Sequence, residues 1–127
     1  MDKSSIDLSS PLLDSEQVQM LISSGGDEAV DLISEILELF REESEANLSA
    51  LESARKAGDL SELGRAAHAL AGSSANIGAG RLWQAAKSLE HSAKEGSLPS
   101  AEAIEDLQSL YQETITAFNG IRSQLEK

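Results

Sequence analysis

The apolar residues of this chain are mostly strong helix formers. Leucine and alanine dominate, whereas valine, a β-branched residue that favours strands, occurs only at Val18 and Val30. The 127 residues contain no cysteine, which excludes disulfides, thiolate nucleophiles and thiolate metal ligands. The sequence therefore predicts an all-α fold whose chemistry must come from oxygen atoms or imidazole rings.

Five segments carry apolar residues at helical spacing and are bounded by capping or helix-breaking residues. A short helix is expected to open at a capping box of Asp14 and Gln17 and to end before Gly25. The four longer helices are expected from an Asp27 cap to Gly58, from an Asp59 cap to Gly78, from about Ala79 to Lys94, and from a Ser100 cap to Leu125. Long amphipathic helices joined by short connections predict an antiparallel up-down-up-down four-helix bundle with a short extra N-terminal helix.

The domain organisation follows from the same reading. Residues 1–10 are polar and are expected to be disordered, and residues 11–127 are expected to form one bundle domain. No apolar run approaches the ~20 residues needed to span a membrane, and the start of the chain lacks a signal sequence. We therefore expect a cytoplasmic protein, free-standing because it starts at Met1 without a flanking domain, and monomeric because the bundle uses one apolar stripe per helix.

Charge indicates the kind of partner. The net charge of −12 disfavours binding to nucleic acid or to anionic membrane surfaces, so a protein partner is expected. Between Arg55 and Lys94, however, six basic residues stand against three acidic ones, and the rest of the chain carries −15. This basic stretch suits an acidic docking partner or a phosphoryl group, although ordinary solvated helix faces would also account for it.

His68 lies on the wrong side of its predicted helix to be a core residue. At ~100° per residue, the apolar positions Leu63, Leu70 and Ile77 fall roughly 180° to 220° away from it. His68 is therefore predicted to face outward.

The residues one or two turns from His68 are small. Gly64, Gly72, Ala71 and Ala75 share its predicted face, and Arg65 is the one large neighbour. Each glycine within a helix costs about 1 kcal/mol relative to alanine, so a compensating role is expected. One role is clearance for a partner to reach the imidazole, which when neutral is a competent nucleophile suited to covalent transfer between proteins. The alternative is a solvated surface histidine beside glycines that permit close helix packing.

The run from His68 to Ala79, HALAGSSANIGA, is similar to the signature of histidine-containing phosphotransfer domains. That signature is a histidine, any residue, a leucine, usually a lysine, a glycine, two small residues and later a glycine with a small neighbour. Residues 37–43 and 47–51 also resemble the preceding helix of that family. The resemblance extends over about residues 27–94, and over the last helix by topology only.

The resemblance implies a helical bundle that acts as an intermediate in a multistep two-component phosphorelay. His68 would accept a phosphoryl group through Nε2 from a receiver-domain aspartate and pass it to another. Gly72 would leave room for the receiver, and Ser73 would form a local hydrogen bond. The implied partners are receiver domains of response regulators or a hybrid sensor histidine kinase. Magnesium would belong to the receiver, so no cofactor or metal is expected on this chain.

The sequence departs from the family pattern at two positions. Ala71 stands where the family usually has a lysine that would pair with phosphoryl oxygens. Arg65 or Lys87 is the candidate substitute cation. Glu90 stands near a position where many members have glutamine, and a carboxylate close to the histidine would repel a phosphoryl group.

Two other functions are compatible with these sequence features. The same fold could be a degenerate adaptor that docks receivers or kinases without carrying phosphate, or a purely structural bundle. Neither His68 nor His91 follows a glutamate by three residues, as bundle metal sites require, and His91 with Glu95 offers at most a weak surface ion site. Trp83 lies at the edge of its helix's apolar stripe, where core packing is the first expectation and partner contact the second.

Overall fold

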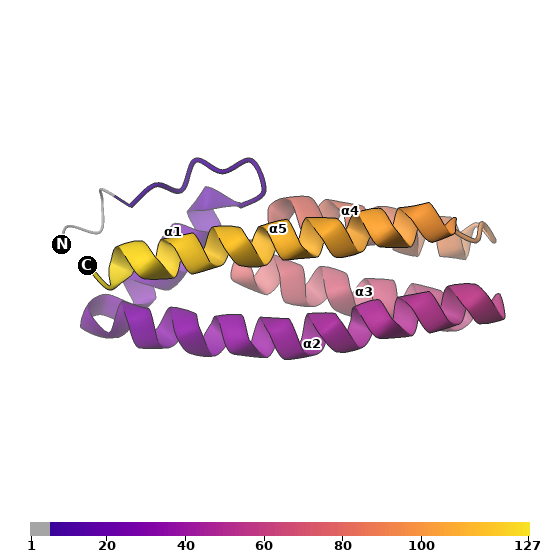
Figure 1. Cartoon of the computed structure of the whole chain (residues 1–127), viewed down its shortest axis with the longest axis horizontal. Coiled ribbons are helices and arrows are strands. Elements are labelled where there is room, and N and C mark those ends of the chain that lie inside the picture. The colour runs from indigo at the N-terminus through magenta and orange to yellow at the C-terminus, as the bar shows by residue number, and fades with distance from the viewer. Residues whose placement is uncertain (1–5) are drawn as a thin grey trace.

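The computed structural model describes residues 6–127 and is helical, with no strand in that range. The α-helices are α1 (Ser15–Gly25), α2 (Ala29–Ala57), α3 (Leu60–Ile77), α4 (Gly80–Lys94) and α5 (Ala101–Leu125), with a 3₁₀ turn, η2 (Gly26–Glu28), before α2. The all-α fold class is confirmed. Figure 1 shows α2 to α5 running lengthwise beside one another in an elongated bundle, with the short α1 at the end where α2 begins.

Most of the predicted helix starts have the expected caps. Asp14, Asp59 and Ser100 each accept a hydrogen bond from the backbone amide three residues later. Asp27 is different, because it lies within η2, and α2 starts at Ala29 without a side-chain cap. The prediction of an Asp27 cap is therefore wrong: the chain bridges α1 and α2 with a tighter helical turn, so the extended backbone that a cap needs is missing.

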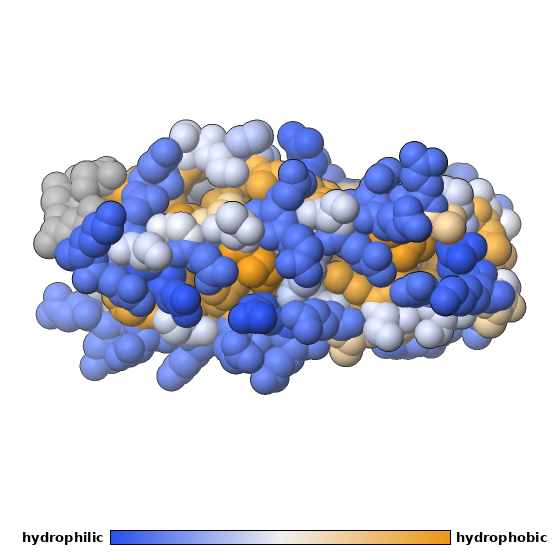
Figure 2. Space-filling model, in the orientation of Figure 1, coloured by the Kyte–Doolittle hydropathy of each residue, from blue (hydrophilic) through white to orange (hydrophobic). Residues whose placement is uncertain are grey.

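The core lies along the inner faces of all five helices. Its largest fully buried apolar side chains are Phe118, Ile22, Ile33, Leu51, Leu63, Leu70, Ile77, Leu82 and Val18. Polar side chains cover much of the face formed by α2 and α5, and apolar surface shows in the furrow between them (Figure 2). This pattern is that of helices with one apolar stripe each.

Short α1 is tied to the turn between α3 and α4. The Asp14 amide donates to the Gly78 carbonyl at 2.8 Å, and Gln17 Nε2 donates to the Asn76 carbonyl at 2.9 Å. Gln17 thus bonds across to α3 and does not reach back to Asp14. Val18 and Ile22 are fully buried below these contacts, so α1 packs on one end of the α2 to α5 bundle.

The polar N-terminal segment is described from residue 6 onward. The prediction of disorder for residues 1–5 lies outside the described residues. For residues 6–10 the structure differs from that prediction, because Ile6 is buried and the Asp7 amide donates to Gln124 on α5 at 2.9 Å. A buried apolar side chain and a satisfied backbone amide are enough to hold this part of the segment against the bundle. Within residues 6–127, no helix has the length and apolar character that crossing a membrane requires.

Candidate functional site

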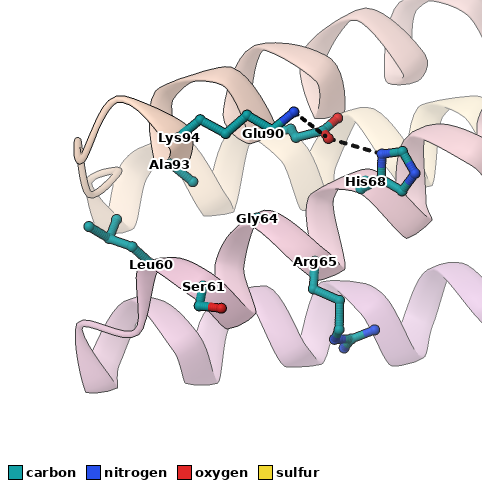
Figure 3. Close-up of a pocket in the computed structure, with 8 residues that line it drawn as sticks. All are labelled: Leu60, Ser61, Gly64, Arg65, His68, Glu90, Ala93 and Lys94. Atoms are coloured by element: carbon teal, nitrogen blue, oxygen red, sulfur yellow. Dashed lines mark hydrogen bonds and ion pairs between the residues drawn. The ribbon is translucent and has the colours of Figure 1, made fainter.

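His68 projects from the outer face of α3, as its helical angle predicts. Its side chain is 72% exposed, and its Nδ1 lies 2.9 Å from Glu90 Oε2 on α4. Figure 3 shows the ring at the surface of α3 with its second nitrogen pointing away from Glu90. The imidazole is therefore accessible at Nε2 and held at Nδ1.

Small residues surround His68 on three of the four predicted positions. Gly72 and Ala75 are exposed, and Gly64 is half-buried, with its nearest neighbour across the helix pair the Cβ of Ala93. Ala71 is only 3% exposed, so its predicted place on the open face is wrong. Ala71 lies on the same side of His68 as Gly64, and α3 packs closely against α4 on that side, which buries its methyl group.

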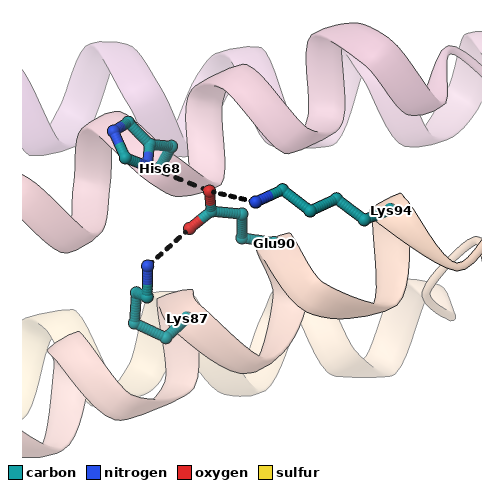
Figure 4. A network of polar contacts seen from close by, with 4 residues as sticks. All are labelled: His68, Lys87, Glu90 and Lys94. Atoms are coloured by element: carbon teal, nitrogen blue, oxygen red, sulfur yellow. Dashed lines mark hydrogen bonds and ion pairs between the residues drawn. The ribbon is translucent and has the colours of Figure 1, made fainter.

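Glu90 is the centre of a network that links α3 to α4. Its side chain is only 7% exposed and receives Lys87 Nζ on Oε1 at 3.0 Å, while Lys94 Nζ lies 3.4 Å from Oε2 (Figure 4). The hydrogen bond from the Lys87 ammonium lowers the pKa of Glu90 to about 2, assisted by His68 and Lys94 and opposed by burial. Glu90 is therefore ionised at neutral pH.

An ionised carboxylate sets the tautomer of the imidazole. It can only accept hydrogen bonds, so the proton on the His68 ring lies at Nδ1, where it is donated to Glu90. The neutral ring then presents its lone pair at Nε2, which faces solvent. The Glu90 carboxylate was expected to repel a phosphoryl group if it lay close to the histidine. It contacts Nδ1, the ring nitrogen opposite to Nε2, and it is paired with two lysines.

The two candidate phosphoryl cations are already engaged. Arg65 forms a two-pronged pair with Glu62, at 2.9 Å through Nε and 2.6 Å through Nη2. Figure 3 shows its guanidinium directed away from the His68 ring. Lys87 belongs to the Glu90 network, so the structure brings it beside the histidine but on the Nδ1 side. Ser73 Oγ forms the expected local contact, 3.2 Å from the Ala69 carbonyl oxygen one turn earlier, and also lies 3.3 Å from Glu43 Oε2 on α2.

A shallow hollow lies beside His68 between α3 and α4. It has a volume of about 440 Å³, and its lining includes Gly64 and Ala93, whose small size leaves the space unfilled (Figure 3). The remaining lining residues are Leu60, Ser61, Arg65, His68, Glu90 and Lys94. The hollow therefore leaves open space next to the imidazole, on the side toward the N-terminus of α3.

The other candidate positions lie apart from this network. His91 pairs with Glu95 one turn away at 3.0 Å, and both side chains are exposed. Among residues 6–127 no cluster of three or more potential ligands could hold a metal ion. Trp83 is 40% exposed, so the expectation that it packs in the core is wrong. Leu82 and Ala86 fill the core-facing stripe of α4 and leave the indole at its edge.

The Glu90 network predicts a specific pH dependence of stability. The pKa of Glu90 in the folded protein, about 2, lies below the ordinary glutamate value of 4.5, so its ionised form stabilises the fold above that value. This contribution is lost as pH falls from about 5 toward 2. We expect the unfolding free energy to fall less over this interval in Glu90→Gln than in the unmodified chain, as measured by urea titration at each pH. An equal fall in the unfolding free energy of both proteins would show that the ionised Glu90 carboxylate does not stabilise the fold.

The comparisons with known proteins agree with this geometry. The Hpt domain family model matches residues 35–119, which is about two-thirds of the chain and includes both His68 and Glu90. The chain belongs to this family of histidine-containing phosphotransfer domains. A search of curated proteins found no match.

A solved structure shows the same fold over most of the chain. The crystal structure of histidine-containing phosphotransfer protein B (HptB) from Pseudomonas aeruginosa PAO1 superposes with a TM-score of 0.79 at 32% sequence identity. The match covers 91% of this chain and 98% of that chain. This likeness agrees with the family match and places the chain among the histidine-containing phosphotransfer domains.

His68 was predicted from the sequence, whereas the role of Lys94 was not. Lys87, Glu90 and Lys94 are spaced by three and four residues, which places them on one face of a helix. That spacing predicts an ion-pair cluster. The sequence could not show that the cluster meets His68, because the contact depends on how α3 and α4 are aligned.

Proposed function

We propose that this chain relays a phosphoryl group between receiver-domain aspartates through Nε2 of His68. The observation that carries the proposal is the exposed imidazole whose Nδ1 is bound to an ionised, buried carboxylate at 2.9 Å. This contact leaves the nucleophilic lone pair on the solvent side. Gly72 and Ala75 add clearance, because they bear almost no side chain on that face.

The proposed reaction balances without a proton acceptor at Nε2. The Nε2 lone pair attacks phosphorus, an N–P bond forms, the P–O bond of the aspartyl phosphate breaks, and aspartate leaves as a carboxylate. The ring becomes cationic as this bond forms, since Nδ1 keeps its proton. Glu90 stabilises that charge through the Nδ1 hydrogen bond, in the way a carboxylate supports a catalytic histidine elsewhere. The reverse steps deliver the group to a second receiver.

The partners proposed for this reaction are receiver domains of response regulators or of a hybrid sensor kinase. Magnesium is proposed to stay with the receiver. We further propose that the scaffold is an antiparallel up-down-up-down bundle with α1 as an addition, and that it works as a cytoplasmic monomer.

The experiment is to incubate the protein with receiver domains of its source organism carrying labelled phosphate. We expect label to appear on this chain that is lost in acid and retained in base, which is the signature of phosphohistidine. Acid-stable label, or no label from any phosphorylated receiver, would contradict the proposal.

A second function is favoured by one observation. Ala71 replaces the usual lysine and is buried, and Arg65 is held by Glu62, so the Nε2 side has no cation from either position. This arrangement would suit an adaptor that docks receivers without carrying phosphate. The adaptor predicts receiver affinity that His68→Ala leaves unchanged, together with no label on the unmodified chain.

A further inference from the structure

Trp83 is an exposed aromatic residue on the helix that supplies Glu90. It is the one tryptophan of the sequence, and 40% of it is exposed. Tryptophan side chains are enriched at the energetic centres of protein interfaces because they bury a large rigid surface. Its position relative to His68 therefore bears on how a partner approaches the site.

Helix geometry places Trp83 on the same side of α4 as Glu90. The two residues are seven positions apart, which corresponds to two turns, an offset of about 20° and about 10 Å along the axis. Glu90 reaches His68 at 2.9 Å, so this stripe of α4 is the one that borders the histidine. The indole accordingly stands on the rim of the phosphoacceptor face, about two turns from the reacting ring.

The α3 residues that lie level with the segment between Trp83 and Glu90 have small side chains. Gly64 lies opposite Ala93 and His68 opposite Glu90, so residue numbers fall along α4 as they rise along α3. Seven residues further along α3 from His68 is Ala75, and seven residues back along α4 from Glu90 is Trp83, so these two residues lie at the same level of the helix pair. Gly72 and Ala75 are exposed and small, which leaves no large side chain of α3 at those two positions between the indole and the imidazole.

The charge on this rim suits an acidic partner. Lys87 lies one turn from Trp83 on α4, and Lys94 follows beyond Glu90, within the stretch that is basic in an otherwise acidic chain. A domain that presents an aspartyl phosphate brings negative charge to the surface it docks with. Charges of opposite sign across an interface orient and accelerate such an encounter.

We propose that Trp83 is the docking anchor for the receiver domain, which packs an apolar side chain bordering its phosphorylated aspartate onto the indole. The inference rests on the proposed phosphotransfer function and adds the residue that positions the partner. Trp83 contributes binding and no chemistry, because its distance of two turns keeps it away from Nε2. It is expected to govern the receiver concentration needed for transfer and to leave the reactivity of His68 unchanged.

The kinetic test compares Trp83→Ala with Leu98→Ala, since Leu98 is another exposed apolar residue, 44% accessible, placed after the end of α4. We expect Trp83→Ala to raise the receiver concentration for half-maximal transfer by about tenfold or more, with the rate at saturation unchanged. Leu98→Ala should match the unmodified chain, and Trp83→Phe should fall between. Labelling of His68 by the small donor phosphoramidate should be equal in all four proteins, and circular dichroism in the far ultraviolet should show the same helix content in each.

The binding test uses Trp83 as its own reporter. Saturation with a tryptophan-free receiver whose aspartate carries beryllium fluoride, a mimic of the phosphoryl group, should shift the indole emission to shorter wavelength, because docking removes water from the ring. An unshifted spectrum at saturation, or an unchanged half-saturation in Trp83→Ala, would overturn the anchor role.

The outcomes separate this inference from the proposed function. If receivers shift the emission but never label the chain, phosphotransfer fails and the docking role of Trp83 stands for an adaptor. If receivers label the chain with equal half-saturation in Trp83→Ala, the function stands and the anchor role fails. If no receiver of the source organism binds or labels the chain, both are rejected.

Discussion

Replacing His68 with glutamine is expected to abolish the acid-labile label that phosphorylated receivers place on this chain. Glutamine retains polar character and similar length but has no nucleophilic ring nitrogen, so the N–P bond cannot form. Removal of a covalent nucleophile lowers transfer by several orders of magnitude, on the order of 10³-fold or more. The measurement is label incorporated per mole of protein after incubation with a phosphorylated receiver.

The matched control for this variant is His91→Gln. Both histidines are exposed, and each has a glutamate within about 3 Å of a ring nitrogen, at 2.9 Å for His68 and 3.0 Å for His91. They differ in which nitrogen is engaged, since Glu95 contacts Nε2 of His91 and Glu90 contacts Nδ1 of His68. We expect full labelling in His91→Gln. Label that persists in His68→Gln would show that another residue accepts the group.

Replacing Gly78 with alanine is expected to cause the largest loss of stability among the glycine positions. Gly78 ends α3 with φ of +88°, and a Cβ atom there would lie 2.9 Å from Val18 Cγ2 and 3.3 Å from the Asp14 carbonyl oxygen. Val18 is fully buried, so it has little room to move. The left-handed conformation costs about 1–2 kcal/mol for an L-residue, and overpacking adds about 1–3 kcal/mol.

Gly58→Ala is the control that separates these two contributions. Gly58 also ends a helix with positive φ, at +69°, but its Cβ would meet nothing within 4 Å. We expect urea unfolding to show a loss of about 1–2 kcal/mol for Gly58→Ala and about 2–5 kcal/mol for Gly78→Ala. Equal losses would mean that the contact between α1 and the end of α3 is loose.

The fold was largely predictable because its helices carry local signals at their ends. Asp14, Asp59 and Ser100 act as the caps that their sequence context predicts, and Gly58 and Gly78 end helices in the left-handed conformation. These signals are local, so they are visible in the sequence. The failure at Asp27 arose where two helices meet with almost no connection and the chain continues in a 3₁₀ turn.

The site was predictable only within one helix. The outward direction of His68 follows from the angular spacing of α3, but its contact with Glu90 depends on how α3 and α4 are aligned along their axes. The burial of Ala71 has the same origin, because the close packing of those two helices covers part of the face that periodicity alone leaves open. Interhelical register is set by packing across the bundle, and no short sequence pattern reports it.

Phosphotransfer through Nε2 is tested by identifying the nitrogen of His68 that carries the phosphoryl group. Nitrogen and phosphorus NMR of the chain, labelled with ¹⁵N in its histidines and phosphorylated by a receiver, distinguishes the two ring positions through their coupling to phosphorus. We expect phosphorus on Nε2, with the proton retained on Nδ1 opposite Glu90. Phosphorus on Nδ1 of His68, or on His91, would contradict this expectation.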